Sequence, residues 1–85
     1  MMRQAILNLI VGTLSEIKPQ PVDVSESLFG WKNNFTPRDV AYVLLQLEAQ
    51  FGIEIESLVR FIDGEKCDYT VNTLVDAVFA QKGTT

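Results

Sequence analysis

The segment from Thr36 to Gly52 constrains the fold most, because a helix start signal, an apolar stripe and a stop signal follow one another there. Thr36 can cap a helix, Pro37 suits the first helical position, and Asp39 lies near the positive end of the helix dipole. Gly52 is typical of a helix end. The apolar residues between them recur at helical spacing: Val40, Val43, Leu44, Leu47 and Phe51. This pattern predicts a helix over Pro37–Phe51.

Two further amphipathic segments flank this helix. The first covers about residues 3–18 and ends before Pro19, with an apolar stripe made of Ile6, Leu9, Ile10, Thr13, Leu14 and Ile17. The last begins after Thr70 as its cap and runs to about Gln81, with a stripe made of Leu74, Val75, Val78 and Phe79. We therefore expect an ordered core over about residues 3–81 and a tail over residues 82–85.

The segment over residues 53–62 is short and ambiguous. Its first residues, Ile53-Glu54-Ile55, alternate as in a strand, whereas the later apolar residues Leu58, Val59 and Ile62 fit one or two helical turns. The Asp63-Gly64 pair indicates a turn. We expect a short third helix here, and no strong strand candidate exists elsewhere.

A long connection over residues 18–35 separates the first two helices. It carries too many large apolar residues for a solvated linker, and connections of more than about 12–15 residues are uncommon in compact domains. We expect it to pack back over the helices with Leu28 and Phe29 as anchors and to turn at Asn33-Asn34. The fold class is therefore all-α, with four helices, a long first loop and a short third helix.

Composition excludes several classes of function. The chain has 85 residues, a net charge of −4, no histidine and one cysteine, Cys67. These counts exclude histidine-dependent nucleophilic catalysis, a Cys/His zinc site and an internal disulfide. The acidic balance disfavours nucleic acid, and no apolar run is long enough to span a membrane. We expect a single cytoplasmic domain over residues 1–85 that is a monomer, is not an enzyme, and binds no metal or cofactor.

The order of elements, together with several short matches, resembles the acyl carrier protein family over about residues 3–81. The stretch at residues 40–55, VAYVLLQLEAQFGIEI, is similar to that family's second helix and the turn after it. The further matches are Leu47-Glu48, Phe51-Gly52-Ile53, Asp23-Val24, Ser27-Leu28-Phe29, Thr70-Val71 and Leu74-Val75. The resemblance implies a four-helix acyl carrier protein-like bundle.

The family's attachment site for phosphopantetheine, an Asp-Ser-Leu motif, falls on Thr36-Pro37-Arg38, with Asp39 at the acidic position that follows. The family's serine position is therefore Pro37, which has no hydroxyl and cannot form the phosphodiester. Residues 29–55 contain no serine, so a small shift of the alignment does not restore the site. The resemblance thus implies a form without the phosphopantetheine arm.

Two other residues are weaker candidates for a carrier site. Thr36 has a hydroxyl, but it lies one residue early, and its capping role directs the oxygen at its own helix. Cys67 lies between Lys66 and Asp68, whose charges offset one another, so nothing there activates the thiol. We expect Cys67 to be a small, half-buried residue before the last helix.

The outer face of the second helix is the candidate docking surface. Steps of about 100° per residue place Arg38, Ala41, Tyr42 and Leu45 on the side opposite the apolar stripe. Ala41 and Leu45 match positions at which the family docks, and Tyr is enriched in protein contacts. The alternatives are an ordinary surface or burial under the long loop. Trp31 either covers the core or joins the interface.

These observations lead to one functional hypothesis and one alternative. The hypothesis is a non-catalytic, acyl carrier protein-like interaction module that docks on a biosynthetic or peptide-modifying enzyme. Among forms without the serine, the chain most resembles the acyl carrier-related proteins of bacterial peptide-maturation systems. The alternative is a true acyl, aminoacyl or peptidyl carrier modified at a non-standard site.

Overall fold

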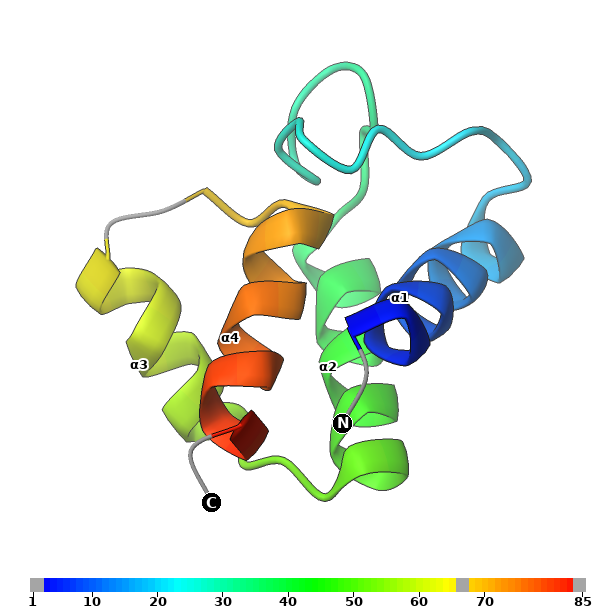
Figure 1. Cartoon of the computed structure of the whole chain (residues 1–85). Coiled ribbons are helices and arrows are strands. Elements are labelled where there is room, and N and C mark those ends of the chain that lie inside the picture. The colour runs from blue at the N-terminus through cyan, green and yellow to red at the C-terminus, as the bar shows by residue number, and fades with distance from the viewer. Residues whose placement is uncertain (1–2, 66–67, 84–85) are drawn as a thin grey trace.

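The computed structural model describes residues 3–65 and 68–83, and all regular structure in this part of the chain is helical. The four helices are α1 (Arg3–Ile17), α2 (Pro37–Phe51), α3 (Ile55–Glu65) and α4 (Val71–Gly83) (Figure 1). The predicted all-helical class, with four helices and a long first loop, is confirmed for these residues, and α3 is the shortest helix although it is longer than the one or two turns expected.

The helices form a ring around one core. Helix α1 packs against α2 and α4, and α3 packs against α4 and, over a shorter stretch, α2. The long connection arches over one end of the bundle (Figure 1). The fully buried side chains at the centre come from all four helices and from the connection: Ile6, Ile10, Leu14, Leu28, Val43, Leu47, Leu58, Ile62, Val71, Leu74 and Val78.

The predicted bounds of α2 are confirmed at both ends. Pro37 is the first helical residue, and Gly52 adopts the left-handed conformation with φ 66°. The Gly52 N–H donates to the Glu48 carbonyl oxygen at 2.9 Å, which satisfies one of the last free carbonyls of the helix. Glycine suits this position because a side chain would strain a positive φ.

The ends of α1 and α4 follow the predicted signals closely. Helix α1 ends at Ile17, two residues before Pro19. Thr70 caps α4 as predicted, since its hydroxyl accepts a hydrogen bond from the Thr73 N–H at 2.9 Å. Helix α4 continues to Gly83, two residues beyond the predicted Gln81.

Helix α3 differs from the expectation at both ends. Ile53 is buried in the turn after α2, and the helix starts at Ile55, so the strand-like alternation there does not form a strand. The predicted turn at Asp63-Gly64 is wrong, because both residues lie inside the helix. The buried Leu58 and Ile62 hold this helix against α4, and their burial outweighs a helix penalty of about 1 kcal/mol for glycine.

The connection between α1 and α2 is attached to the start of α4. The Leu28 N–H donates to the Tyr69 carbonyl oxygen at 2.7 Å, and the Asn72 N–H donates to the Val24 carbonyl oxygen at 3.1 Å. The second bond satisfies an N–H in the first turn of α4, where helices lack internal acceptors. Leu28 is fully buried, which confirms it as an anchor.

Buried Asn33 organises the connection from within. Its side-chain amide donates to the carbonyl oxygens of Asp23, Glu26 and Ser27 at 3.0, 3.2 and 3.2 Å. Its side-chain oxygen accepts from the Asp23 N–H at 2.9 Å. The predicted turn at Asn33-Asn34 is confirmed, and Asn34 takes a positive φ of 54°, a conformation that asparagine tolerates better than most residues.

Two aromatic residues of the connection are more exposed than predicted. Phe29 is 43% exposed and touches Tyr69 edge to face, so it is a surface residue rather than a core anchor. The interpretation of Trp31 as a core cover is wrong, because its side chain is 85% exposed. The cause is the turn built around Asn33, which directs the chain at Trp31 toward solvent. Cys67 and the end of the predicted tail, residues 84–85, lie outside the described residues.

Replacing Asn33 tests its role in the connection. We expect Asn33→Ala to lower the free energy of unfolding by about 2–4 kcal/mol, because the fully buried amide would be lost and the Asp23 N–H and the Asp23 and Glu26 carbonyl groups would lose this partner. Urea denaturation measures the change. The matched control is Asn34→Gly, which keeps the positive φ and should change stability by less than about 1 kcal/mol. An Asn33→Ala protein as stable as the parent would contradict this role.

Candidate functional site

The first turn of α2 carries the position at which the resemblance places an attachment serine. Pro37 occupies it as the first helical residue, and its side chain is exposed. The Thr36 hydroxyl accepts from the Asp39 N–H at 3.2 Å, and the Thr36 N–H donates to an Asp39 carboxylate oxygen at 3.0 Å. The Thr36 hydroxyl, the only one next to Pro37 in the sequence, is therefore hydrogen-bonded to the backbone of its own helix.

The four predicted docking residues lie together on the outer face of α2. Arg38, Ala41, Tyr42 and Leu45 are all exposed, and their helical spacing places them on one face. Tyr42 is 45% exposed and Leu45 is 53% exposed. Burial of this face under the long connection is therefore excluded.

Few charges accompany the apolar residues of this face. Arg38 lies at its start and Glu48 borders it near the end of the helix. Within residues 3–65 and 68–83, neither side chain forms an ion pair. The surface thus has an apolar centre, with the Arg38 guanidinium at one end and the Glu48 carboxylate at the other. Single exposed apolar residues are common on soluble proteins, so an ordinary surface is the alternative interpretation.

The connection carries two exposed aromatic residues, Phe29 and Trp31, and Phe29 contacts the half-buried Tyr69 before α4. The Lys32 ammonium lies 5.7 Å from the Trp31 ring centroid. Burial, with a further contribution from the Asp63 carboxylate, raises the pKa of the Tyr69 hydroxyl. The predicted alternative that Trp31 joins an interface stays a prediction.

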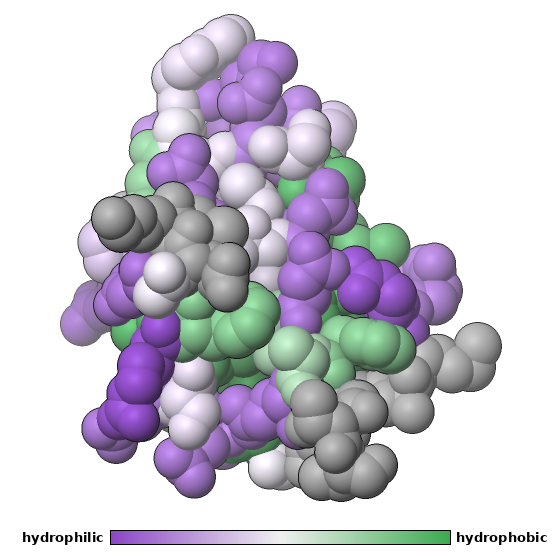
Figure 2. All heavy atoms as spheres, turned by 60° about the vertical axis from the view of Figure 1, so that its left-hand side comes forward, coloured by the Kyte–Doolittle hydropathy of each residue, from purple (hydrophilic) through white to green (hydrophobic). Residues whose placement is uncertain are grey.

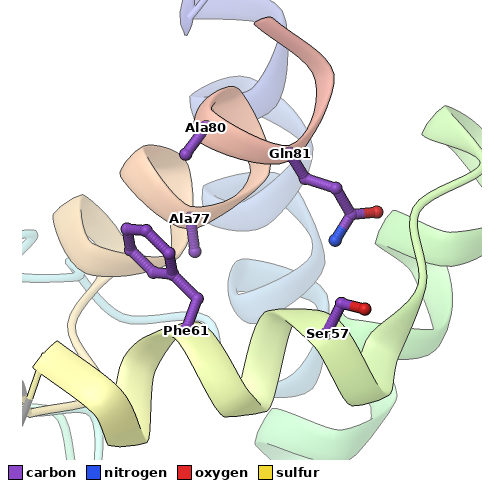
Figure 3. Close-up of a pocket in the computed structure, with 5 residues that line it drawn as sticks. All are labelled: Ser57, Phe61, Ala77, Ala80 and Gln81. Carbon is purple, nitrogen blue, oxygen red and sulfur yellow. The ribbon is translucent and has the colours of Figure 1, made fainter. Parts of the chain in front are cut away.

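A third surface feature was missed by the sequence reasoning. The side of the molecule that carries α3 and α4 shows a band of hydrophobic side chains between hydrophilic ones (Figure 2). A groove of about 350 Å³ lies between the two helices, lined by Ser57, Phe61, Ala77, Ala80 and Gln81. Phe61 from α3 points toward the alanines of α4, and Ser57 faces Gln81 at the other end (Figure 3). Helical period places Ser57 and Phe61 on one side of the buried stripe of α3, but the sequence does not show which residues of α4 face them.

The described residues contain no group of three or more His, Cys, Asp or Glu side chains that could hold a metal ion. Asp23 has a perturbed carboxyl, since hydrogen bonds from the Ser25 N–H and hydroxyl, with help from Lys32, lower its pKa. These bonds hold a loop turn in place, which accounts for the shift. No helix in the described part of the chain is long and apolar enough to cross a bilayer.

Comparison with known proteins adds no relative. No family model matches the chain, and neither the curated proteins nor the solved structures contain a significant match. The relation to acyl carrier proteins therefore rests on the residues and element order given above.

The capping box at the start of α2 can be tested directly. We expect Thr36→Ala to lower the free energy of unfolding by about 1 kcal/mol, because the Asp39 N–H would lose its acceptor. Thr36→Ser keeps that acceptor and should retain most of the stability. Thermal unfolding compares the two variants, and faster amide exchange at Asp39 in Thr36→Ala would place the loss at this turn. Equal stability of both variants would show that the hydroxyl does not cap the helix.

Proposed function

We propose that this protein is a non-catalytic interaction module with an acyl carrier protein-like fold and no phosphopantetheine arm. Its outer α2 face docks on a biosynthetic or peptide-modifying enzyme in the cytoplasm, and the module acts as a monomer. The observation that carries the proposal is the exposed pair of Tyr42 and Leu45 on the same helix that begins with Pro37.

Three features support an acyl carrier protein-like fold without a phosphopantetheine arm. The four helices and the long first loop come in the order that the resemblance implies, and the third helix is the shortest of the four. The resemblance aligns the family's serine with Pro37, and Pro37 is the first residue of the second helix. The Thr36 hydroxyl is engaged in a capping box, which makes it a poor site for an attached arm. A bacterial peptide-maturation system is the setting that the chain most resembles.

The chemistry of the α2 face supports protein docking. Tyr42 supplies a rigid amphipathic side chain, and Leu45 supplies an aliphatic one beside it. The small Ala41 lets a partner approach the helix closely, and Arg38 can meet a carboxylate of that partner. Because this face carries few charges, we infer that its affinity depends more on apolar contact than on steering by charge.

Intact mass tests whether the module carries an arm. After co-expression with a phosphopantetheinyl transferase, we expect the mass to equal that of the unmodified chain, because Pro37 offers no hydroxyl. A serine-bearing acyl carrier protein in the same cells is the positive control. The Pro37→Ser variant should retain the helical circular dichroism spectrum, since serine also suits helix starts. A mass gain of one phosphopantetheine on the parent chain would overturn the proposal.

Charge insertion on the α2 face tests the docking surface. The enzymes encoded beside this protein are the candidates, and their affinity can be measured by calorimetry. We expect Leu45→Asp to weaken binding at least about tenfold, because burying an unpaired carboxylate in an apolar contact is costly. Leu45 is half exposed, so the variant should fold. Ser15→Asp on α1 adds the same charge to another exposed position and should bind as the parent does. Equal affinity of Leu45→Asp and the parent would exclude the α2 face.

A further inference from the structure

The charges at the two ends of the outer α2 face are opposite in sign and unpaired. Arg38 and Glu48 are both exposed, and they lie about 15 Å apart along the helix axis. In the part of the chain that the structure describes, neither side chain forms an ion pair. A helix face with a cation at one end and a carboxylate at the other is complementary to its own copy when the two helices run antiparallel.

The apolar side chains between these charges also match a second copy. Residue 43 lies midway between Arg38 and Glu48, so a two-fold axis at that height sets positions equally far before and after it opposite one another. The exposed Leu45 of one copy then faces the small Ala41 of the other, and a large side chain opposite a small one allows two helices to pack closely. Tyr42 lies beside the axis, where it meets the Tyr42 ring of the other copy.

The rest of the domain leaves room for a helix at this face. Helix α2 contacts α1 and α3, and the long connection arches over the end of the bundle rather than along the outer side of α2 (Figure 1). Tyr42 is 45% exposed and Leu45 is 53% exposed, so both can be covered by a copy. An antiparallel arrangement also brings the positive end of each helix dipole near the negative end of the other.

The size of the face indicates a weak dimer. A contact strip about 15 Å long and about 10 Å wide is well below the area of about 800 Å² per partner that is typical of stable interfaces. Such a dimer dissociates on dilution, and the monomer is then the main species. Self-association therefore matters only where the protein is concentrated.

We propose that the outer face of α2 pairs with the same face of a second copy in a weak, antiparallel, two-fold symmetric dimer, with Arg38 of each copy against Glu48 of the other. The pair covers Tyr42 and Leu45, so self-association and docking on an enzyme exclude one another. The pairing follows from the face itself, whereas its regulatory consequence rests on the proposed function. The monomer is the form that docks, and the dimer is a form whose docking face is covered.

Exchange of the two charges tests the pairing. Sedimentation equilibrium between about 10 μM and about 1 mM protein measures the dimer dissociation constant. We expect Arg38→Glu to weaken the dimer about tenfold, because it sets two carboxylates against each other at two symmetric contacts. Glu48→Arg should weaken it by a similar factor. The double variant Arg38→Glu/Glu48→Arg should recover most of the parent's association, because opposite charges meet again across the axis.

NMR of the ¹⁵N-labelled parent locates the contact. We expect the amides of Ala41, Tyr42 and Leu45 to shift as the protein is concentrated, and the shifts to decrease at high salt. Leu45→Asp should abolish the concentration dependence, because it places a carboxylate in the apolar centre. The matched control Ser15→Asp adds the same charge to an exposed position on α1 and should associate as the parent does. Circular dichroism checks that each variant folds.

Three outcomes would overturn the pairing. They are a parent that stays monomeric up to about 1 mM, a double variant that associates as weakly as the single variants, and concentration-dependent shifts confined to residues outside α2. Each can occur while the enzyme still binds the parent and discriminates against Leu45→Asp, so the proposed function would stand. An enzyme that binds the dimer without dissociating it would overturn the regulatory consequence. Conversely, a restored dimer with enzyme binding insensitive to Leu45→Asp would support the pairing and exclude the proposed docking.

Discussion

The buried amide of Asn33 is the interaction on which the arrangement of the whole domain depends. The connection between α1 and α2 is long, and closing it costs chain entropy that apolar contacts must offset. Asn33 gathers three carbonyl groups of that connection, and this fixes the turn that places Leu28 in the core. Backbone bonds from Leu28 then join the connection to the starts of both α2 and α4. Because the connection is held over the end of the bundle, the outer face of α2 is left open.

Helix bounds could be predicted from the sequence where the start and stop residues lie within the helix segment itself. The bounds of α2 were predictable because a cap, a proline and a terminal glycine all lie within the segment they define. The length of α3 was not predictable, because the Asp63-Gly64 pair fits both a turn and a helix. The choice is made by packing of Leu58 and Ile62 against α4, a contact between segments that only the assembled fold brings together.

Some surface features also follow from local sequence, whereas others depend on the assembled fold. The exposure of Tyr42 and Leu45 follows from helical period, once the buried stripe of α2 is recognised. The exposure of Trp31 does not follow from any such period, because it depends on an irregular turn that the Asn33 side chain holds together. The α3–α4 groove was also beyond sequence reasoning, since Phe61 forms a floor only where the small residues of α4 face it (Figure 3).

Pro37 makes the start of the proposed docking helix rigid. Proline fixes φ at the first helical position, and the capping box between Thr36 and Asp39 satisfies the adjoining N–H groups. A helix start held in this way loses less conformational entropy when a partner binds beside it. Pro37 and the capping box therefore favour binding at the face proposed on α2.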